Sequence, residues 1–283
     1  MNFSKTMYRY GRDPLSVLLL GFVWLAAAVT FLSLAFLLFY ILWQGLPNLS
    51  PKLFELEYST ENVSMFPAML DTLIMVVLAL LMATPLGIFA AIYLVEYAKR
   101  GNKIVNVVRV TADTLSGIPS IVYGLFGMLF FVTYLHMGYS LLAGSCTVAI
   151  MILPLIMRTT EEALRAVPDS FREGSYGLGA GKLRTVFAVV LPSAVPGILA
   201  GVILGIGRIV GETAALIYTA GTVAALPTNV MSSGRTLAVH MYVLASEGLY
   251  MQQAYATAVV LVLLVIGINA ASARVAKKLM KGN

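Results

Sequence analysis

Long runs of apolar residues, separated by short polar segments, set the pattern of this chain. Six runs approach or exceed the roughly 20 residues that a helix needs to cross about 30 Å of hydrocarbon. They cover residues 15–43, 69–95, 114–135, 139–157, 196–220 and 254–273. Because backbone polar groups in lipid must bond within their own segment, each run is predicted to be a helix. The predicted fold class is therefore an all-α membrane protein with about six transmembrane helices.

The first run follows three basic residues and could be mistaken for a secretory signal peptide. It stays apolar as far as Trp43, whereas the apolar part of a signal peptide spans about 7–15 residues. We therefore predict a retained helix ending at Trp43, a residue type favoured at the membrane interface. In or near later runs, Pro85, Pro119 and Pro154 are predicted to kink the helices.

Composition agrees with this class. Hydrophobic residues make up 59% of the chain and charged residues only 11%, and the mean hydropathy is +0.88. A soluble domain carries about 25% charged residues, so nothing indicates a separate soluble domain. Cys146 is the only cysteine. An intrachain disulfide and a cysteine-clustered metal site are therefore excluded.

The placement of Lys and Arg predicts the orientation, because cytoplasmic loops carry an excess of these residues. Sixteen of the nineteen lie on one side, in the two terminal tails and in the loops after the second and fourth spans. Only Lys52 and Arg235 lie on the other side, and Arg208 lies within a span. Both termini are thus predicted to be cytoplasmic. The net charge of +6 reflects this rule and does not indicate nucleic-acid binding.

About 35 residues separate the fourth and fifth spans on the cytoplasmic side. Ser170 followed by Glu173 has the spacing of a capping box, and Gly179 is typical of a helix end. The pattern predicts a short helix over residues 171–178. Its apolar side chains are Phe171, Tyr176 and Leu178. Such side chains in a polar segment favour docking onto another protein, although a helix lying on the membrane surface fits the same pattern.

This segment resembles the cytoplasmic signature of permease subunits of ATP-binding-cassette importers, E-A-A-x3-G-x9-I-x-L-P. The matching positions are Glu173, Gly179, Val189, Leu191 and Pro192, whereas Gly174 and Ser175 replace the two alanines. The resemblance implies that the short helix sits in a groove of an ATPase subunit and transmits its motion. The coupling residues implied are Ser170, Phe171, Glu173, Tyr176, Leu178 and Gly179.

Three further segments resemble permeases of phosphate importers, and they cover residues 116–124, 158–164 and 205–214. The modest length and the continuation Glu212-Thr213-Ala214 are more similar to PstA-type than to PstC-type permeases. The resemblance extends from Asp71 to the C-terminus. It implies a division at residue 67. Residues 1–67 would form the N-terminal tail, first transmembrane helix and outer loop, and residues 68–283 a core permease domain with a coupling loop at about 158–192.

Residues 179–182, Gly-Ala-Gly-Lys, are similar to part of a nucleotide-binding P-loop. That motif requires a glycine where this chain has Tyr176, and Ser or Thr where it has Leu183. No nucleotide site is therefore predicted here. The resemblance implies that this chain carries no cofactor and that a separate ATPase subunit uses the ATP.

Arg208 lies inside the fifth run, twelve residues after Pro196. A charge at that depth costs about 2.5–3.5 kcal/mol on insertion scales, and such residues usually face a cavity or a partner. Glu212, four residues later, is predicted to share its face. One interpretation is an anion contact in the translocation path, with Glu212 moderating the grip of the arginine. A structural ion pair between helices is the alternative, and the resemblance favours the path.

Arg158 and Glu161 form a second predicted pair, three residues apart at the cytoplasmic end of the fourth span. The resemblance suggests that Arg158 receives or releases phosphate at the inner mouth of the path. The residues alone favour a different interpretation, a cytoplasmic anchor with a surface partner.

Gly197, Gly201 and Gly205 recur at four-residue intervals in the fifth run, and Gly207 and Gly211 repeat the interval. Small residues on one helical face allow close backbone approach. The stripe could pack within the chain, or it could form a face shared with a second permease subunit.

The remaining polar residues are weaker candidates for a functional site. Asp71 and Asp113 lie near predicted span starts, where helix capping is the expected role. Ser116 and Ser120, around Pro119, could face an anion or pack around a kink. The histidines and outer-loop acids are His136, His240, Glu55, Glu57 and Glu61, and no histidine has metal-ligand spacing. The outer segments 43–67 and 222–253 could contact an external binding protein.

The resemblance implies one transmembrane subunit of an ATP-driven phosphate importer in a prokaryotic cytoplasmic (inner) membrane. Its expected partners are a PstC-like second permease subunit, ATPase subunits, an external phosphate-binding protein, phosphate and membrane lipid. No catalytic residues and no nucleic-acid partner are expected. Two alternatives remain, namely a permease for sulfate or molybdate and an ATP-independent secondary transporter or channel. Secondary transporters often carry internal repeats, and none is evident in this chain.

Overall fold

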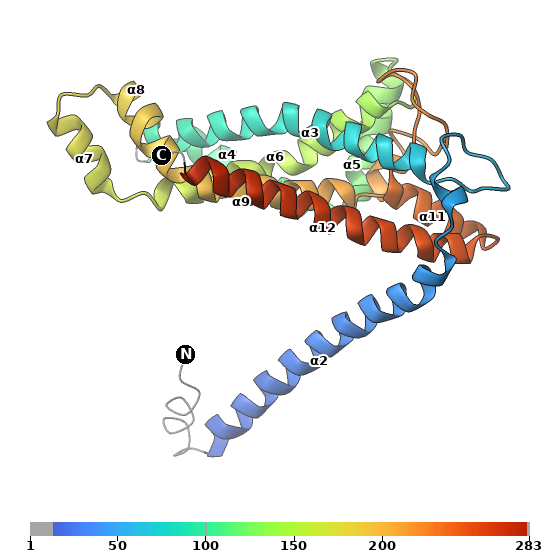
Figure 1. Ribbon diagram of the computed structural model, residues 1–283. Coiled ribbons are helices and arrows are strands. Elements are labelled where there is room, and N and C mark those ends of the chain that lie inside the picture. The colour runs from blue at the N-terminus through green and yellow to red at the C-terminus, as the bar shows by residue number, and fades with distance from the viewer. Residues whose placement is uncertain (1–13, 100, 282–283) are drawn as a thin grey trace.

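Four long helices lie side by side and form the body of the molecule (Figure 1). The computed structural model describes residues 14–99 and 101–281, and within these ranges it contains helices and loops but no strand. The four helices are α3 (Phe66–Ile92), α6 (Leu141–Arg165), α9 (Leu191–Val210) and α12 (Met251–Lys281). Their facing apolar side chains form the central core, which includes Met75, Ile152 and Val210.

Five helices of the described ranges are long and apolar enough to cross a membrane, and a bent pair brings the number to six. The prediction of about six spans in an all-α protein is therefore confirmed. Helix α2 (Pro14–Gly45) matches the first predicted run. It diverges from the bundle in Figure 1 and meets α12 only near its C-terminal end, where Tyr40 contacts Tyr255. The basic residues Lys5, Arg9, Arg12 and Arg100 lie outside the described residues.

The third predicted span differs from the structure. Instead of one helix over residues 114–135, helix α4 (Lys103–Ser116) and helix α5 (Ser120–Gly127) meet at an angle of 102°. A π-helical turn, η4 (Met128–Tyr134), continues α5. The break lies at Pro119, which cannot donate a backbone hydrogen bond and which keeps the preceding residue out of the helical region. Pro119 thus separates two helices, whereas Pro85 and Pro154 lie inside continuous ones.

The cytoplasmic segment is more helical than expected. Helix α6 continues past the predicted end at Met157 to Arg165, and helix α7 (Asp169–Gly177) follows after a short turn. From Lys182 the chain is helical again through α8 (Lys182–Thr185) and the π-helical turn η5 (Val186–Val190) into α9. Only residues 166–181 therefore connect the two long helices. In Figure 1, α7 lies beyond one end of the bundle and α11 (Leu237–Glu247) lies at the opposite end.

Helix α9 ends earlier than predicted, at Val210 instead of residue 220. After Gly211 the chain turns into the short helix α10 (Ala214–Ile217), which packs against α5. A methyl group added at Gly124 of α5 would lie 2.8 Å from the Ala215 Cα atom. Glycine at position 124 therefore permits the close approach of α5 and α10.

Asp71 does not cap a helix. It is fully buried in the second turn of α3, and one carboxylate oxygen accepts the Arg235 backbone N–H at 3.1 Å. The Arg235 guanidinium lies over the Tyr58 ring at 4.8 Å, and His240 is buried against the same ring. Burial lowers the pKa of His240 to about 3, so this side chain stays neutral near pH 7. The contacts fasten the outer loop to α3.

Candidate functional site

Helix α7 begins differently from the predicted capping box. Pro168 is its N-cap residue, and no side chain accepts a hydrogen bond there. Ser170 is therefore inside the first turn, and both Ser170 and Glu173 are exposed. A proline before a helix has a fixed backbone angle suited to chain entry, and Asp169 places a carboxylate near the positive end of the helix. The predicted helix is present, but the predicted capping box of Ser170 and Glu173 is wrong.

The outer surface of α7 is apolar and exposed. No residue of α7 is buried, and the exposed fractions are 49% for Phe171, 43% for Tyr176 and 91% for Leu178. Gly179 ends the segment with a φ angle of +82°, which L side chains rarely adopt. A hollow of about 550 Å³ lies between α7 and η5, with Phe171 and Val189 in its walls. The arrangement presents apolar side chains next to a recess.

Arg172 joins α7 to the bundle. Its guanidinium holds the Glu96 carboxylate with an Nη2–Oε1 distance of 2.7 Å and an Nε–Oε1 distance of 3.2 Å. It also donates to the backbone carbonyls of Leu164 and Val167 at 2.9 and 2.8 Å, at the end of α6 and just beyond it. The Arg172 and Glu96 side chains are only 14% and 6% exposed. The hydrogen bond to Glu96 raises the pKa of Arg172 above its ordinary value.

The contacts of Arg172 connect α7 with the ends of two long helices. Glu96 lies in the π-helical turn η3 (Tyr93–Tyr97), which extends α3. Through Arg172, α7 is therefore bonded to the ends of both α3 and α6. A second link joins the Ser175 and Thr185 hydroxyls at 2.8 Å. Charge-assisted, multiply bonded guanidinium contacts are the stronger class of hydrogen bond, so α7 is firmly attached to the ends of both long helices.

Helices α4 and α6 carry a set of ion pairs, which differs from the predicted Arg158–Glu161 pair. Arg158 instead bonds Asp113 of α4 at 2.5 Å. Glu161 is bonded through the same carboxylate oxygen to Arg109 of α4 at 2.7 Å and to Arg165 at 2.6 Å. The prediction was wrong because partners on α4 lie closer than the neighbour three residues away. Asp113, expected near a helix start, lies in the last turn of α4.

Arg208 and Glu212 do not form the predicted pair. Since α9 ends at Val210, Glu212 is no longer on the same helical face. Its carboxylate is buried and accepts the Ala215 backbone N–H at 3.0 Å, where it supports the start of α10. Arg208 is exposed, and it takes part in none of the ion pairs formed within residues 14–99 and 101–281.

The depth of Arg208 follows from the packing of α9 on α6. A methyl group added at Gly205 would lie 3.9 Å from Ile156, so Arg208, about one turn further, is level with the middle of α6. Arg208 is thus in the last turn of its helix, yet at mid-depth of the bundle.

The glycines of α9 lie on two different faces. A methyl group at Gly197 would meet Ala163 of α6 at 2.6 Å, and one at Gly201 would overlap Thr159. With Gly205 they pack within the chain, so their face is not available to a second subunit. By contrast, a methyl group at Gly207 would contact no atom in the described part of the chain. The exposed residues beside it form an open stripe at four-residue spacing, namely Pro196, Ala200, Leu204 and Arg208.

Sequence reasoning missed the partners of Arg172. Glu96 lies 76 residues earlier, and only its place at the end of an apolar run, where a lone carboxylate is unusual, could have drawn attention to it. Arg109 was likewise assigned to the general excess of cytoplasmic cations. The Ser116 hydroxyl already has a partner in its own helix, because it donates a hydrogen bond to the Ala112 carbonyl at 2.9 Å.

Comparison with known proteins places these features in context. Residues 83–281 match the family model described as "Binding-protein-dependent transport system inner membrane component". A probable ABC transporter permease protein, YqgI of Bacillus subtilis, is 32% identical over 249 residues, which are 81% of this chain and 83% of that protein. The phosphate transport system permease protein PstA of Pasteurella multocida is 38% identical over 206 residues, 69% of this chain and 72% of that protein.

Solved structures share the fold at lower identity. A chain of a bacterial alginate ABC transporter, solved with an alginate pentasaccharide-bound periplasmic protein, has a TM-score of 0.70 at 15% identity and covers 99% of both chains. A chain of the MetNI methionine ABC transporter, in an inward-facing conformation, has a TM-score of 0.59 at 21% identity, covering 76% of this chain and 94% of that chain.

Proposed function

This chain belongs to the family of binding-protein-dependent transport system inner membrane components, and we propose that it is the PstA-type permease subunit of a phosphate importer. The observation that carries the proposal is the identity of 31–38% shared with phosphate permeases of three organisms, over regions that span most of both chains. The chain contributes part of the membrane path and performs no covalent chemistry.

The proposed assembly contains a PstC-like second permease subunit, ATPase subunits that use ATP, and an external phosphate-binding protein. The assembly resides in the prokaryotic cytoplasmic membrane, with α7 and both termini on the cytoplasmic side. The excess of Lys and Arg at the α7 end supports this orientation. At the opposite end, the exposed acidic residues Glu55, Glu57 and Glu61 lie in the outer segment before α3, where the binding protein would contact the chain.

The proposed coupling element is α7. Phe171, Tyr176 and Leu178 enter a groove of the ATPase subunit, where burial of their apolar surface provides the affinity. Movement of the ATPase displaces α7, and the Arg172–Glu96 contact passes that displacement to α3 and α6. Glu173 and Gly179, which carry the family signature, remain exposed on the side available to the ATPase.

Arg208 is the proposed anion contact of the path. It is a guanidinium at mid-depth of the bundle, exposed on the open stripe of α9 and without a carboxylate partner among the described residues. A guanidinium presents several N–H donors in a geometry that matches phosphate oxygens. The open stripe would face the second permease subunit, so the path would run between the two subunits. Arg158, with its half-exposed side chain, would meet the anion nearer the cytoplasm.

The decisive experiment is uptake of labelled phosphate into liposomes that contain this chain, its permease partner and the ATPase, with the binding protein outside and ATP inside. ATP-dependent phosphate uptake that excess sulfate and molybdate leave unchanged is the expected result. ATP-driven uptake of sulfate or molybdate in place of phosphate would retain the architecture and replace the substrate. Uptake that proceeds without ATP would contradict the importer and favour a secondary transporter or channel.

A further inference from the structure

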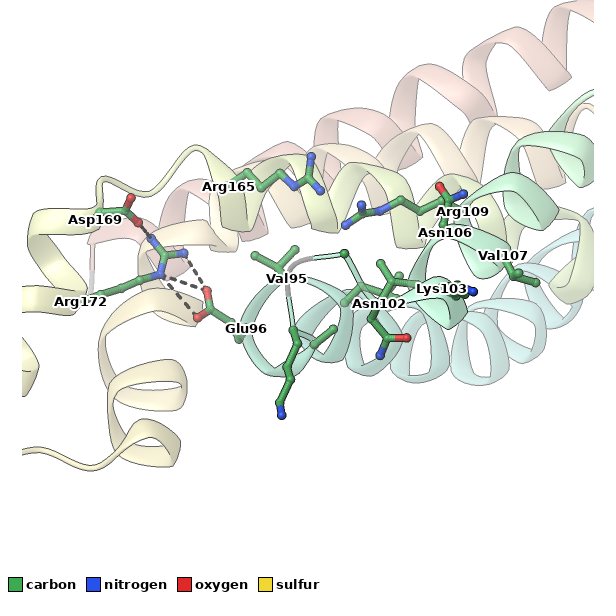
Figure 2. Close-up of a pocket in the computed structure, with 15 residues that line it drawn as sticks. Val95, Glu96, Asn102, Lys103, Asn106, Val107, Arg109, Arg165, Asp169 and Arg172 are labelled. Atoms are coloured by element: carbon green, nitrogen blue, oxygen red, sulfur yellow. Dashed lines mark hydrogen bonds and ion pairs between the residues drawn. The ribbon is translucent and has the colours of Figure 1, made fainter.

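A cavity of about 880 Å³ lies at the cytoplasmic end, and neither Arg208 nor the exposed apolar residues Phe171 and Tyr176 of α7 line it. Its walls come from the end of α3, the start of α4 and the region where α6 turns into α7 (Figure 2). The charged residues that line it are Glu96, Lys99, Lys103, Arg109, Arg165, Asp169 and Arg172. Five of these are basic and two are acidic.

The two acidic residues of the cavity wall already form ion pairs. Both Glu96 and Asp169 bond Arg172, at 2.7 and 3.2 Å. In Figure 2 these three form a closed group on one side of the cavity, while Arg109 and Arg165 extend toward each other from α4 and α6. The positive charges of Arg109 and Arg165 are therefore not balanced by the carboxylates that line the cavity.

Arg109 and Arg165 share a single counter-charge. Both contact the same oxygen of Glu161, so two guanidinium groups are set against one carboxylate. The Arg109 Nε atom is buried and has no hydrogen-bond partner among the residues that the structure describes. An arginine carries five N–H donors, and the two together therefore hold more donors than Glu161 can satisfy. Lys103, which forms no ion pair within the described ranges, adds a further charge at the cavity wall.

The neighbouring surface of α4 is apolar. Ile104 and Val107 are 66% and 63% exposed, and Val107 also lines the cavity. A basic cavity bordered by exposed apolar side chains at the cytoplasmic membrane level has the chemistry that binds phosphorylated lipid headgroups. The same paired guanidiniums would also bind inorganic phosphate, because phosphate oxygens match the planar fork of arginine.

We propose that Arg109 and Arg165, with Lys103 at the cavity wall, form a binding site for a phosphate group on the cytoplasmic side of this chain. The phosphate group belongs to an anionic phospholipid or to free inorganic phosphate. Arg208 does not line this cavity. Arg109 and Arg165 also line the neighbouring hollow that contains Arg158, so the test must remove both proposed path contacts.

The test uses the full-length chain in neutral detergent, with the subunits that co-purify with it. One arm titrates phosphatidylglycerol and, as a control, phosphatidylcholine, and counts bound lipids by native mass spectrometry. The other arm measures binding of radiolabelled orthophosphate by equilibrium dialysis without ATP, in a background that carries Arg208→Gln and Arg158→Gln and so removes both proposed path contacts. Both arms compare Arg165→Gln and Lys103→Gln with Lys277→Gln, an exposed cytoplasmic lysine outside the cavity.

We expect phosphatidylglycerol to bind at least tenfold more tightly than phosphatidylcholine. Arg165→Gln should weaken binding about tenfold, Lys103→Gln less, and Lys277→Gln not at all. The same ranking with orthophosphate would identify free phosphate as the source. Arg165→Gln leaves Arg109 on Glu161, and Lys103→Gln breaks no ion pair of the described residues, so both variants should fold. Absence of binding in both arms, or equal loss in Lys103→Gln and Lys277→Gln, would overturn the site.

Discussion

The charged residues at the cytoplasmic end have ion-pair partners on other helices, whereas the single arginine at mid-depth has none among the described residues. Arg158, Glu161 and Arg172 each bond a residue from another helix. Arg208 is exposed on the open stripe of α9 and has no such partner among the described residues. Charges in a membrane protein are costly unless they are paired or face a cavity. The difference therefore separates arginines whose charge is paired with another helix from Arg208, whose charge is not paired within the described residues.

The largest loss of stability is expected on breaking the Arg172–Glu96 ion pair, which is the most buried. Replacing Arg172 by Gln leaves Glu96 buried without its counter-charge, and breaking a buried pair costs roughly 3–5 kcal/mol. The attachment of α7 should weaken, and ATP hydrolysis should no longer drive uptake. Hydrogen exchange of the α7 amides, together with coupled ATPase and uptake assays, measures both effects. The exposed Arg184→Gln serves as the control. Unchanged exchange in α7 would show that Arg172 does not anchor it.

Replacing the unpaired Arg208 should reduce phosphate uptake without loosening the structure. Arg208→Gln breaks no ion pair in the described residues, so the assembled complex should persist with unchanged thermal stability. Loss of hydrogen bonds to a charged group costs about 1.5–3 kcal/mol, which corresponds to a roughly 10- to 100-fold fall in phosphate uptake. Arg208→Lys should retain part of the activity because it keeps the charge without the fork. Normal uptake by Arg208→Gln would remove this residue from the path.

The two faces of α9 give a matched pair of substitutions. Gly201→Ala forces a methyl group into Thr159 of α6, and overpacking of this kind costs about 1–3 kcal/mol. The methyl group of Gly207→Ala meets no atom of the described residues, so this variant should leave the stability of the isolated subunit unchanged. Thermal unfolding in detergent compares them directly. If Gly207→Ala weakens association with the second permease, the open stripe is the shared face. Equal destabilisation of the isolated subunit by both variants would contradict the assignment of faces.

The smallest effect is expected at the most exposed pair. The Arg158 and Asp113 side chains are 52% and 53% exposed, and exposed ion pairs contribute about 0–1 kcal/mol. Asp113→Asn should therefore change stability very little, while it frees Arg158 to bind an anion. Measuring uptake and thermal unfolding in parallel tests this expectation. A large loss of stability would place this pair with the structural contacts of Arg172.

Much of the fold could be predicted because hydropathy is a local property. The first, second and last spans lie where the apolar runs place them. Helix α7 was predicted from the spacing of Ser170 and Glu173 and from Gly179, although its N-cap is Pro168. The errors occurred where prolines and glycines admit more than one backbone path. Pro119 breaks the third span outright, and α9 ends at Val210, ten residues before the apolar run does.

The sequence alone therefore determined the class of protein, the number of membrane segments and the exposure of helix α7, and its cations predict the orientation. These properties depend on the residues within one segment and on their transfer from water to lipid. Only the tertiary structure decided which charges are paired. Arg172 and Glu96 lie 76 residues apart, and Arg109 and Glu161 come from different helices. Such contacts depend on how the helices pack, and spacing along the chain does not encode that packing.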